Sequence, residues 1–522
     1  MWQVLYERQG PIRKRALHAQ IAARLEARFE ARPAEHLVAE LVDQFHAAQD
    51  WVKSLDYIRI ALRTAAARFA NRDSLVMLDR AKEIAAHLSQ PERTFAEMEI
   101  LERRAGTYSA NHDAAAEECY EQVIALARRL GAVESEVRSL LGLAYAASWE
   151  NPQRSLAILE EALDSSRRLE DSVNRKTAQL VIYVRQIWAG GWDRQKARDC
   201  ELLLGEMKRQ SGDEGSPLAL INFSMICMVS SRYRMAHDTF KAGYAALFQS
   251  RDYLTSSYLN RAVWMYHVGV PWSCIFLGEF GRAQAEFEAG IGILSRNNDQ
   301  AALSAFNTYS SLMFFFARDY RRAFALSSPV ARGIISPGQH DQAPAPKVLP
   351  VAGRIALIFS GLSAIALGDL EQGLMFLTAA ERRMTDKQAY LDWYWRPALQ
   401  LGWVELKLAK GDLAAAREAA GKFIHLAEET DERTWQGLAW DSMARTRLRS
   451  ADIAGAETAL LQALSACEGF EAPLAKWTIH ETAAAIYKGS GDTDKADAHA
   501  GEAIRIGKEL AARLSATGEV RH

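Results

Sequence analysis

The sequence predicts an all-α protein made of stacked pairs of antiparallel helices. One observation is composition: the 522-residue chain is rich in Ala, Leu, Glu and Arg, is 49% hydrophobic and holds only 13 prolines, which suits a mostly helical protein. A second is a short motif that recurs at a fixed step, and a third is that no stretch indicates a β-strand. A period of about 20 to 50 residues is typical of repeat architectures, in which each helix pair must stack on the next.

The recurring motif is an acidic residue followed four positions later by a very small one. It steps by 40 residues from Asp412 to Asp452 and again to Asp492. Earlier copies begin at Glu279, Asp319 and Asp369. We expect the acidic residue to lie in a tight turn, at the positive N-terminal end of the second helix of a pair. The small residue lets that helix pack closely on its neighbour. Further small residues follow seven positions later at Ala380, Ala463 and Ala503.

Residues 1–90 are predicted to form a helical segment ahead of the repeats. Helices are expected over residues 10–32, 34–49, 50–69 and 71–88. Pro11 and Asp50 are typical of helix starts, and Pro33 and Pro91 mark boundaries.

Residues 91–515 are predicted to form the repeat array, with about nine helix pairs. Before the acidic motifs begin, turns are expected at 111–113, 149–152, 190–193 and 231–233. Pro271 lies inside an apolar helix and should kink or split it. Residues 328–350 contain five prolines and are predicted to be a loop inserted between repeats.

Large and small residues recur at matching places in the first helices of several pairs. They are Trp440, Met443 and Ala444, then Leu141, Gly142 and Tyr145, and finally Tyr487. This pattern resembles the tetratricopeptide repeat. The resemblance implies a superhelical solenoid in which the first helix of each pair lines a concave face that binds peptides or small effectors.

The first 90 residues carry a second resemblance. Its motifs are Val4–Glu7, Arg13–His18, Leu25–Glu26, His36–Leu41, His46, Trp51 and Arg68–Arg72. They are similar to the connector that follows the ATPase module in bacterial signalling ATPases of the STAND/AAA type. Such proteins carry a nucleotide-cyclase or winged-helix effector, then the ATPase, then a tetratricopeptide array. The resemblance implies that the chain is the regulatory part, with the effector and ATPase encoded upstream, or a stand-alone relative of it.

Composition narrows the function classes further. A formal net charge of -2 gives no overall attraction to nucleic acid or to acidic membranes. Scattered cysteines without a CxxC pair indicate buried thiols in a reducing compartment. No secretory signal begins the chain, and the apolar run 355–367 is too short to span a bilayer. We therefore expect a cytoplasmic protein that binds neither nucleic acid nor membrane.

No motif indicates catalysis. The chain has no GxxxxGK[ST] loop for phosphates. His480-Glu481 lacks the second histidine of a zincin helix. The acidic cluster from Asp492 to His499 is interpreted as a helix N-terminus rather than a metal site. We expect no enzyme activity, cofactor or metal in this chain.

One aromatic cluster is the candidate binding site. Its members are Tyr390, Trp393, Tyr394, Trp395, Arg396 and Trp435. Aromatic residues with arginine are typical of interface hot spots, and these residues would lie on neighbouring first helices. For Trp403 and Trp440 a core position is the favoured interpretation. A second candidate is the helix that carries Trp264, Tyr266, His267 and Trp272.

Three functional hypotheses follow. The first is a non-catalytic array that binds a protein or peptide on its concave face and so regulates a signalling ATPase, a cyclase or a transcriptional regulator. The second is a repeat domain that senses a small effector. The third, least favoured, is part of an enzyme whose catalytic and ATP-binding domains lie elsewhere. The oligomeric state stays open.

Overall fold

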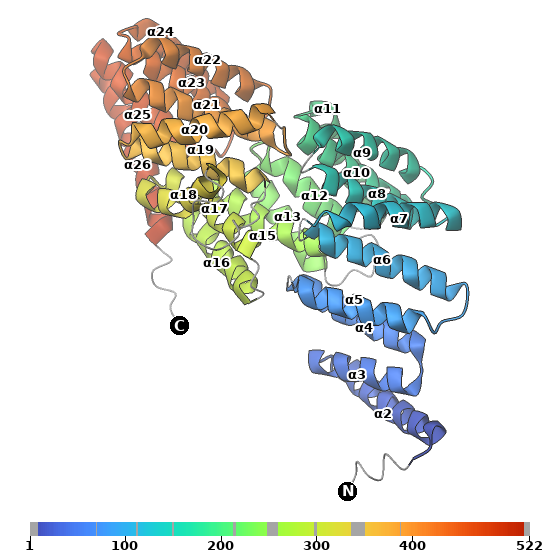
Figure 1. Cartoon of the computed structure of the whole chain (residues 1–522). Coiled ribbons are helices and arrows are strands. Elements are labelled where there is room, and N and C mark those ends of the chain that lie inside the picture. The colour runs from blue at the N-terminus through green and yellow to red at the C-terminus, as the bar shows by residue number, and fades with distance from the viewer. Residues whose placement is uncertain are drawn as a thin grey trace. The chain divides into compact units, whose positions relative to one another are not determined.

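The computed structural model describes residues 9–68, 70–110, 113–148, 151–211, 216–247, 259–296, 300–335, 350–386 and 388–515. In these ranges the chain forms 24 α-helices and no strand (Figure 1). The predicted all-α class is therefore confirmed. Packing divides the chain into two compact units, and each unit is described by itself.

The first unit contains residues 1–146 with the short segments 164–169 and 250–263. Its helices are α2 (Pro11–Ala31), α3 (Glu35–Ala48), α4 (Trp51–Ala67), α5 (Asn71–Ala85), α6 (Glu92–Ala110), α7 (Ala115–Leu130) and most of α8 (Val133–Ser148). The apolar stripes of α3, α4 and α5 form one core around Leu41, Phe45, Ile58 and Leu78. Within the described part of the chain before residue 90, the structure has four helices, as the sequence predicts.

The junction at residue 90 is not a packing boundary. Helices α5 and α6, on either side of it, pack against each other inside the first unit. The assignment of residues 1–90 as a connector stays a prediction.

The second unit contains residues 147–163, 170–249 and 264–522. Its helices are most of α9 (Pro152–Ser166), α10 (Ser172–Gly190), α11 (Arg194–Ser211), α12 (Pro217–Met228), α13 (Tyr233–Leu247), most of α15 (Leu259–Phe276), α16 (Phe280–Arg296), α17 (Gln300–Phe316), α18 (Tyr320–Ile335), α19 (Pro350–Ala366), α20 (Leu370–Asp386), α21 (Asp392–Ala409), α22 (Leu413–Glu428), α23 (Arg433–Arg449), α24 (Ile453–Ala466), α25 (Pro473–Ser490) and α26 (Thr493–Ser515).

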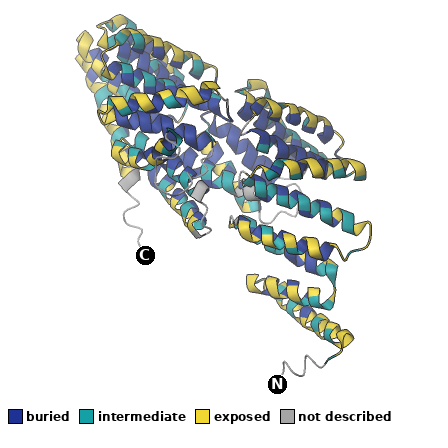
Figure 2. Ribbon diagram, in the orientation of Figure 1, coloured by how far each residue is buried: buried dark blue, intermediate teal, exposed yellow. Residues whose placement is uncertain are grey.

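From α17 onward the helices form two layers. The first helices of the pairs, α17, α19, α21, α23 and α25, contact one another in series. The second helices, from α18 to α26, each pack on the first helix of their own pair. Helix α19 buries every residue from Val351 to Ile365, whereas α20 buries only one face; Figure 2 shows this difference between the two layers. The inner layer is thus formed by the first helices.

The turn inside each of these pairs has one repeated geometry. The residue before the acidic one adopts a left-handed conformation, as at Gly411 with φ 74° and Ala451 with φ 59°. The amide of Asp412 then donates to the carbonyl of Lys407 at 3.0 Å, which closes the first helix with a Schellman-type bond. The acidic side chain caps the next helix by accepting from the amide three residues on, at Asp319, Asp369, Asp412, Asp452 and Asp492. The predicted capping role is confirmed at these positions.

The predicted small residues lie where the two helices of a pair meet. Ala323, Ala416 and Ala456 are fully buried. Ala380 and Ala463, seven positions after the small residue of their own turns, are buried as well. Their short side chains let the backbones approach closely.

The expectations about prolines are met only in part. Helix α15 runs without interruption through Pro271, so the split is excluded, and a kink at this residue stays a prediction. The predicted loop is corrected at its start. Helix α18 continues to Ile335 with Pro329 inside it, so residues 328–335 are not loop. The reason is that the buried face of α18 includes Val330 and Ala331, whose burial favours continuing the helix. The rest of the predicted loop, 336–349, lies outside the described residues, and α19 begins at Pro350.

The second unit also closes on itself. Helix α16 packs against α26, and early turns contact the starts of late helices. The carbonyl of Trp188 accepts from the amide of Leu391 at 3.0 Å and from Nε1 of Trp393 at 3.3 Å. Asp431 accepts from Trp192 at 3.0 Å and from Arg194 at 2.9 Å. Residues 231–234 likewise contact residues 432–434 and Glu471. We call all of these contacts the closing seam.

No described helix is long and apolar enough to cross a membrane.

Candidate functional site

A groove lies on the inner layer of the second unit. It has a volume of about 810 Å³ and is lined almost entirely by the first helices α17, α19, α21, α23 and α25. Its residues are Phe315, Phe316, Arg318, Tyr320, Leu362, Ile365, Ala366, Leu401, Glu405, Leu408, Ala409, Leu438, Arg445, Leu448, Arg449, Leu474, Trp477, Thr478, Glu481, Thr482 and Ala485. Volumes of about 300–1,000 Å³ are typical of ligand pockets.

The walls of the groove are mostly apolar. Each inner helix contributes a leucine or phenylalanine: Phe316 from α17, Leu362 from α19, Leu401 from α21, Leu438 from α23 and Leu474 from α25. This repetition follows from stacking equivalent helices side by side. The groove can therefore take up apolar side chains along its length.

Arg318 bridges one side of the groove to the other. Its guanidinium donates to both carboxylate oxygens of Glu481 on α25, at 2.8 and 2.6 Å. It also lies over the Trp477 ring, 3.5 Å from the ring centroid. A two-pronged ion pair with a stacked aromatic ring fixes the orientation of an arginine, although both charged side chains remain partly exposed.

A second arginine is fixed between two acids on the wall. Arg445 binds Glu405 of α21 at 2.5 Å and Asp441 of its own helix at 2.9 Å. Asp441 is fully buried, and this burial raises its pKa although Arg445 acts in the opposite direction. Arg449, one turn further along α23, lines the groove without an ion-pair partner among the described residues. The groove thus combines apolar walls with fixed charges of both signs.

The predicted aromatic cluster is brought together, but most of it is interior. Tyr394 and Trp395 are fully buried, Trp435 is 1% exposed and Tyr390 is 8% exposed. Trp395 lies 4.9 Å from Trp272, ring centroid to ring centroid. The expectation that these four residues line an open groove is corrected. The closing seam covers the N-terminal halves of α21 and α23, so their aromatic residues form core.

The other two predicted residues are partly exposed. Trp393 donates to the carbonyl of Trp188, and Arg396 donates to the carbonyl of Met384 at 3.3 Å. A binding role for Trp393 and Arg396 stays a prediction. In the second candidate helix, His267 and Trp272 are buried, and Tyr266 stacks on Tyr244 at 3.9 Å.

The residues that line the groove carry no local motif. They lie in the later turns of the inner helices, for example Leu408 on α21 and Leu448 on α23. The one available signal is their place in the repeat, because Glu405 and Arg445 are 40 residues apart and meet across adjacent helices.

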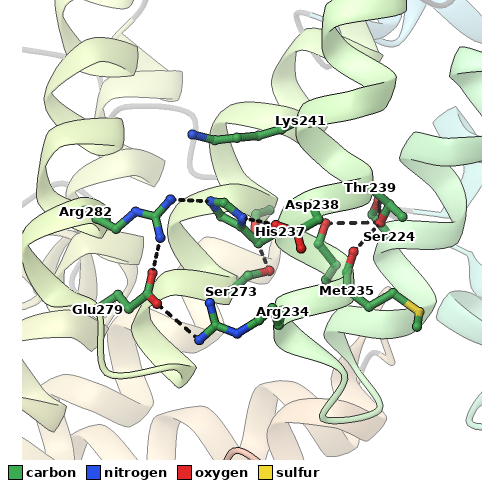
Figure 3. Close-up of polar contacts among 12 residues, drawn as sticks. Ser224, Arg234, Met235, His237, Asp238, Thr239, Lys241, Ser273, Glu279 and Arg282 are labelled. Carbon is green, nitrogen blue, oxygen red and sulfur yellow. Dashed lines mark hydrogen bonds and ion pairs between the residues drawn. The ribbon is translucent and has the colours of Figure 1, made fainter.

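A polar network joins α13 to α16 around His237 (Figure 3). Arg282 reaches Nε2 of His237 at 3.2 Å, and Nδ1 of His237 lies 2.8 Å from Asp238. Arginine only donates, so Nε2 accepts and Nδ1 donates to the carboxylate. Both ring nitrogens are thereby used, and the network joins two helices without leaving a base for a substrate.

Side chains that could ligate a metal ion do not cluster in the described ranges. No group of three or more His, Cys, Asp or Glu side chains there is arranged to hold an ion. Asp492 caps α26, and His499 contacts His480 with 2.8 Å between their Nδ1 atoms.

Comparisons with known proteins identify the fold. No protein-family model matches the sequence, and no curated protein matches it. The structure is similar to that of a Rap protein complexed with Competence and Sporulation Factor, with a TM-score of 0.51 and 12% identity over 72% of this chain and 99% of that one. Another match is the APC/C hetero-tetramer Cut9-Hcn1, with a TM-score of 0.40 and 13% identity over 97% and 94% of the two chains. The first likeness supports a tetratricopeptide-like fold.

Proposed function

We propose that the second unit is a non-catalytic binding array that holds a short segment of a protein or peptide partner in the groove. The observation that carries this proposal is the groove itself, with apolar walls and fixed arginine and glutamate side chains on one continuous inner layer. Its volume is too small for a folded domain, so a partner would insert a segment of chain. The Rap protein of similar fold is in a complex with Competence and Sporulation Factor, which supports a binding role.

The finer proposal concerns what the array regulates. The motifs of residues 1–90 resemble the connector of signalling ATPases, so we propose that occupancy of the groove biases an ATPase, a cyclase or a transcriptional regulator linked to this chain. Protein or peptide binding is the first candidate. A small effector is the alternative, favoured by the ion pair of Arg318 with Glu481, which places charged groups of both signs in the groove lining for a small polar ligand.

The experiment is a peptide selection on the full chain with matched groove variants. A random peptide library would be panned against the wild-type protein, and affinities of the enriched peptides measured by fluorescence polarisation. Ala409→Trp and Ala485→Trp place a large ring on exposed residues that line the groove. Ala414→Trp, on an exposed position of outer helix α22, is the control.

We expect both groove variants to weaken binding at least about tenfold, a loss of about 1.4 kcal/mol, while the control binds as the wild type does. Equal binding by all four proteins would refute the groove assignment. If no peptide is enriched, a thermal-shift screen with metabolites separates the alternatives, because a small effector that binds the folded state raises Tm.

A further inference from the structure

Glu432 is a buried carboxyl group at the closing seam. It precedes α23 as the N-cap residue and is fully buried. Its side chain accepts from the amides of Thr434 at 3.3 Å and Trp435 at 2.6 Å. It also accepts from Ser231 Oγ at 2.8 Å and forms a hydrogen bond with the Tyr233 hydroxyl. Ser231 lies 201 residues earlier, so one carboxyl group joins the α12–α13 turn to the start of α23.

No basic side chain among the described residues bonds to Glu432. The charged groups on the packed elements bind elsewhere. Arg234 binds Glu279, as Figure 3 shows, and also Glu471. The other pairs are Arg232 with Glu201, Arg433 with Gln436, and Asp431 with Trp192 and Arg194. On the α24 side, burial raises the pKa of the Cys467 thiol to about 12, so that group is neutral. An ionised Glu432 would have no cation to offset its loss of water.

The hydrogen bonds can accommodate either protonation state. When Glu432 is neutral, its carboxyl group can donate a hydrogen bond to the Tyr233 oxygen. The Tyr233 hydroxyl then donates to Thr434 Oγ1 at 3.2 Å. When Glu432 is ionised, Tyr233 must donate to the carboxylate instead. Burial is the largest influence and raises the pKa of Glu432 to about 7, although the amide of Trp435 and the Ser231 hydroxyl favour the ionised form.

We propose that the contact of Ser231 and Tyr233 with Glu432, here called the seam latch, is a proton-operated switch. Neutral Glu432 holds the α12–α13 turn against the start of α23, and its ionisation weakens that contact. Helix α23 also carries Leu438, Arg445 and Arg449 into the groove. The latch would therefore regulate the groove, a link that rests on the proposed function, whereas the latch itself does not.

The direction in which pH changes the stability of the closed latch follows from the raised pKa of Glu432. A carboxyl group with a raised pKa in the folded state stabilises that state fully below its unfolded value, and this contribution is lost as pH rises through the folded value. For a folded pKa of about 7, the closed latch should lose stability by about tenfold between pH 6 and pH 8.

The test is hydrogen exchange of the full chain without any ligand, followed by mass spectrometry at pH 6 and pH 8. Rates are corrected for the intrinsic pH dependence of exchange. In the wild type, protection of segments 229–236 and 430–437 should fall by about tenfold between the two pH values. Glu432→Gln, which cannot ionise, should show no such fall. Asp452→Asn, at the exposed N-cap of α24, is the matched control and should respond to pH as the wild type does.

A second variant keeps the test decisive if Glu432→Gln does not fold. Ser231→Ala removes a donor that favours the carboxylate, so it should raise the pKa of Glu432 in the closed latch and make the fall in protection between pH 6 and pH 8 larger than in the wild type. A wild type without the fall, or the same fall in Glu432→Gln, would overturn the latch. Neither result depends on a groove ligand, so failure of the latch is distinct from failure of the proposed function.

Discussion

The outer turns and the closing seam place the same kind of residue in opposite environments. In the outer turns, Asp412, Asp452 and Asp492 cap the second helices, the first two from exposed positions and Asp492 from a half-buried one. In the seam, Asp392 begins α21 and Glu432 caps α23, and both are fully buried. All five are acidic residues at helix starts, repeated at 40-residue steps within each set.

The two environments move the pKa in opposite directions. The Lys495 side chain and amide lower the pKa of Asp492. Burial raises the pKa of Asp392 to about 6, against the opposing effect of Arg354. Capping is a local property, whereas the charge state of the capping residue depends on what covers it.

The largest expected effect comes from removing a seam aromatic. Trp435→Ala leaves a cavity among Phe276, Tyr394 and Trp395 and should cost about 3–5 kcal/mol of unfolding free energy. Leu461→Ala, on the exposed outer surface, should change stability by less than about 0.5 kcal/mol. Urea unfolding of the full chain measures both. Similar losses for the two variants would mean that the seam is no better packed than the surface.

A buried ion pair between inner helices α19 and α21 should be nearly as important at pH 8. Arg354 lies 2.6 Å from Asp392, and both are buried. Arg354→Met leaves an uncompensated carboxylate and should cost about 3–5 kcal/mol at pH 8. The loss should shrink at pH 5, below the pKa of Asp392, because that group is then neutral.

The matched control for this pair is Arg382→Met. Arg382 pairs with Asp386 on the exposed face of α20, so its removal should have little effect at either pH. A loss in Arg354→Met that does not depend on pH would instead assign the effect to packing.

An outer cap should contribute less. Asp452→Ala leaves the Gly455 amide without its acceptor and should cost about 1 kcal/mol. Asp452→Asn keeps a side-chain oxygen and should restore most of that loss. Thermal unfolding compares the two; equal Tm values would show that capping is not what this residue provides.

The bridge across the groove should have the smallest effect on stability. Arg318→Gln removes a partly exposed ion pair with Glu481 and should cost no more than about 1 kcal/mol, less at high salt. A larger loss in urea unfolding would show that the Arg318 side chain holds α17 against α25, instead of serving the groove.

Local chemistry made the repeats predictable. The Asp caps depend on neighbours within about one helical turn, and the small residues recur at fixed spacings from them, so the sequence indicates both directly. Helix boundaries before residue 90 follow from the same signals. Pro329 was predicted less well, since burial of the surrounding helix outweighs the hydrogen bond that proline removes.

The candidate site was harder to predict because both the groove and the seam join residues that are far apart in the chain. Arg318 meets Glu481 across 163 residues, and Trp192 meets Asp431 across 239. The sequence places Trp395 and Trp435 correctly on inner helices but does not reveal that early turns cover them. The groove lies instead beside the later turns of these helices, at Leu408, Arg445 and Leu448.

The sequence by itself determines that this protein is a series of capped helix pairs with close-packed small residues, because those features depend on contacts along the chain. Only the tertiary structure decides which acids are buried, which aromatics become core and where the groove remains open. Those properties depend on which distant turns cover an inner helix, and a repeated local pattern is the same whether or not it is covered.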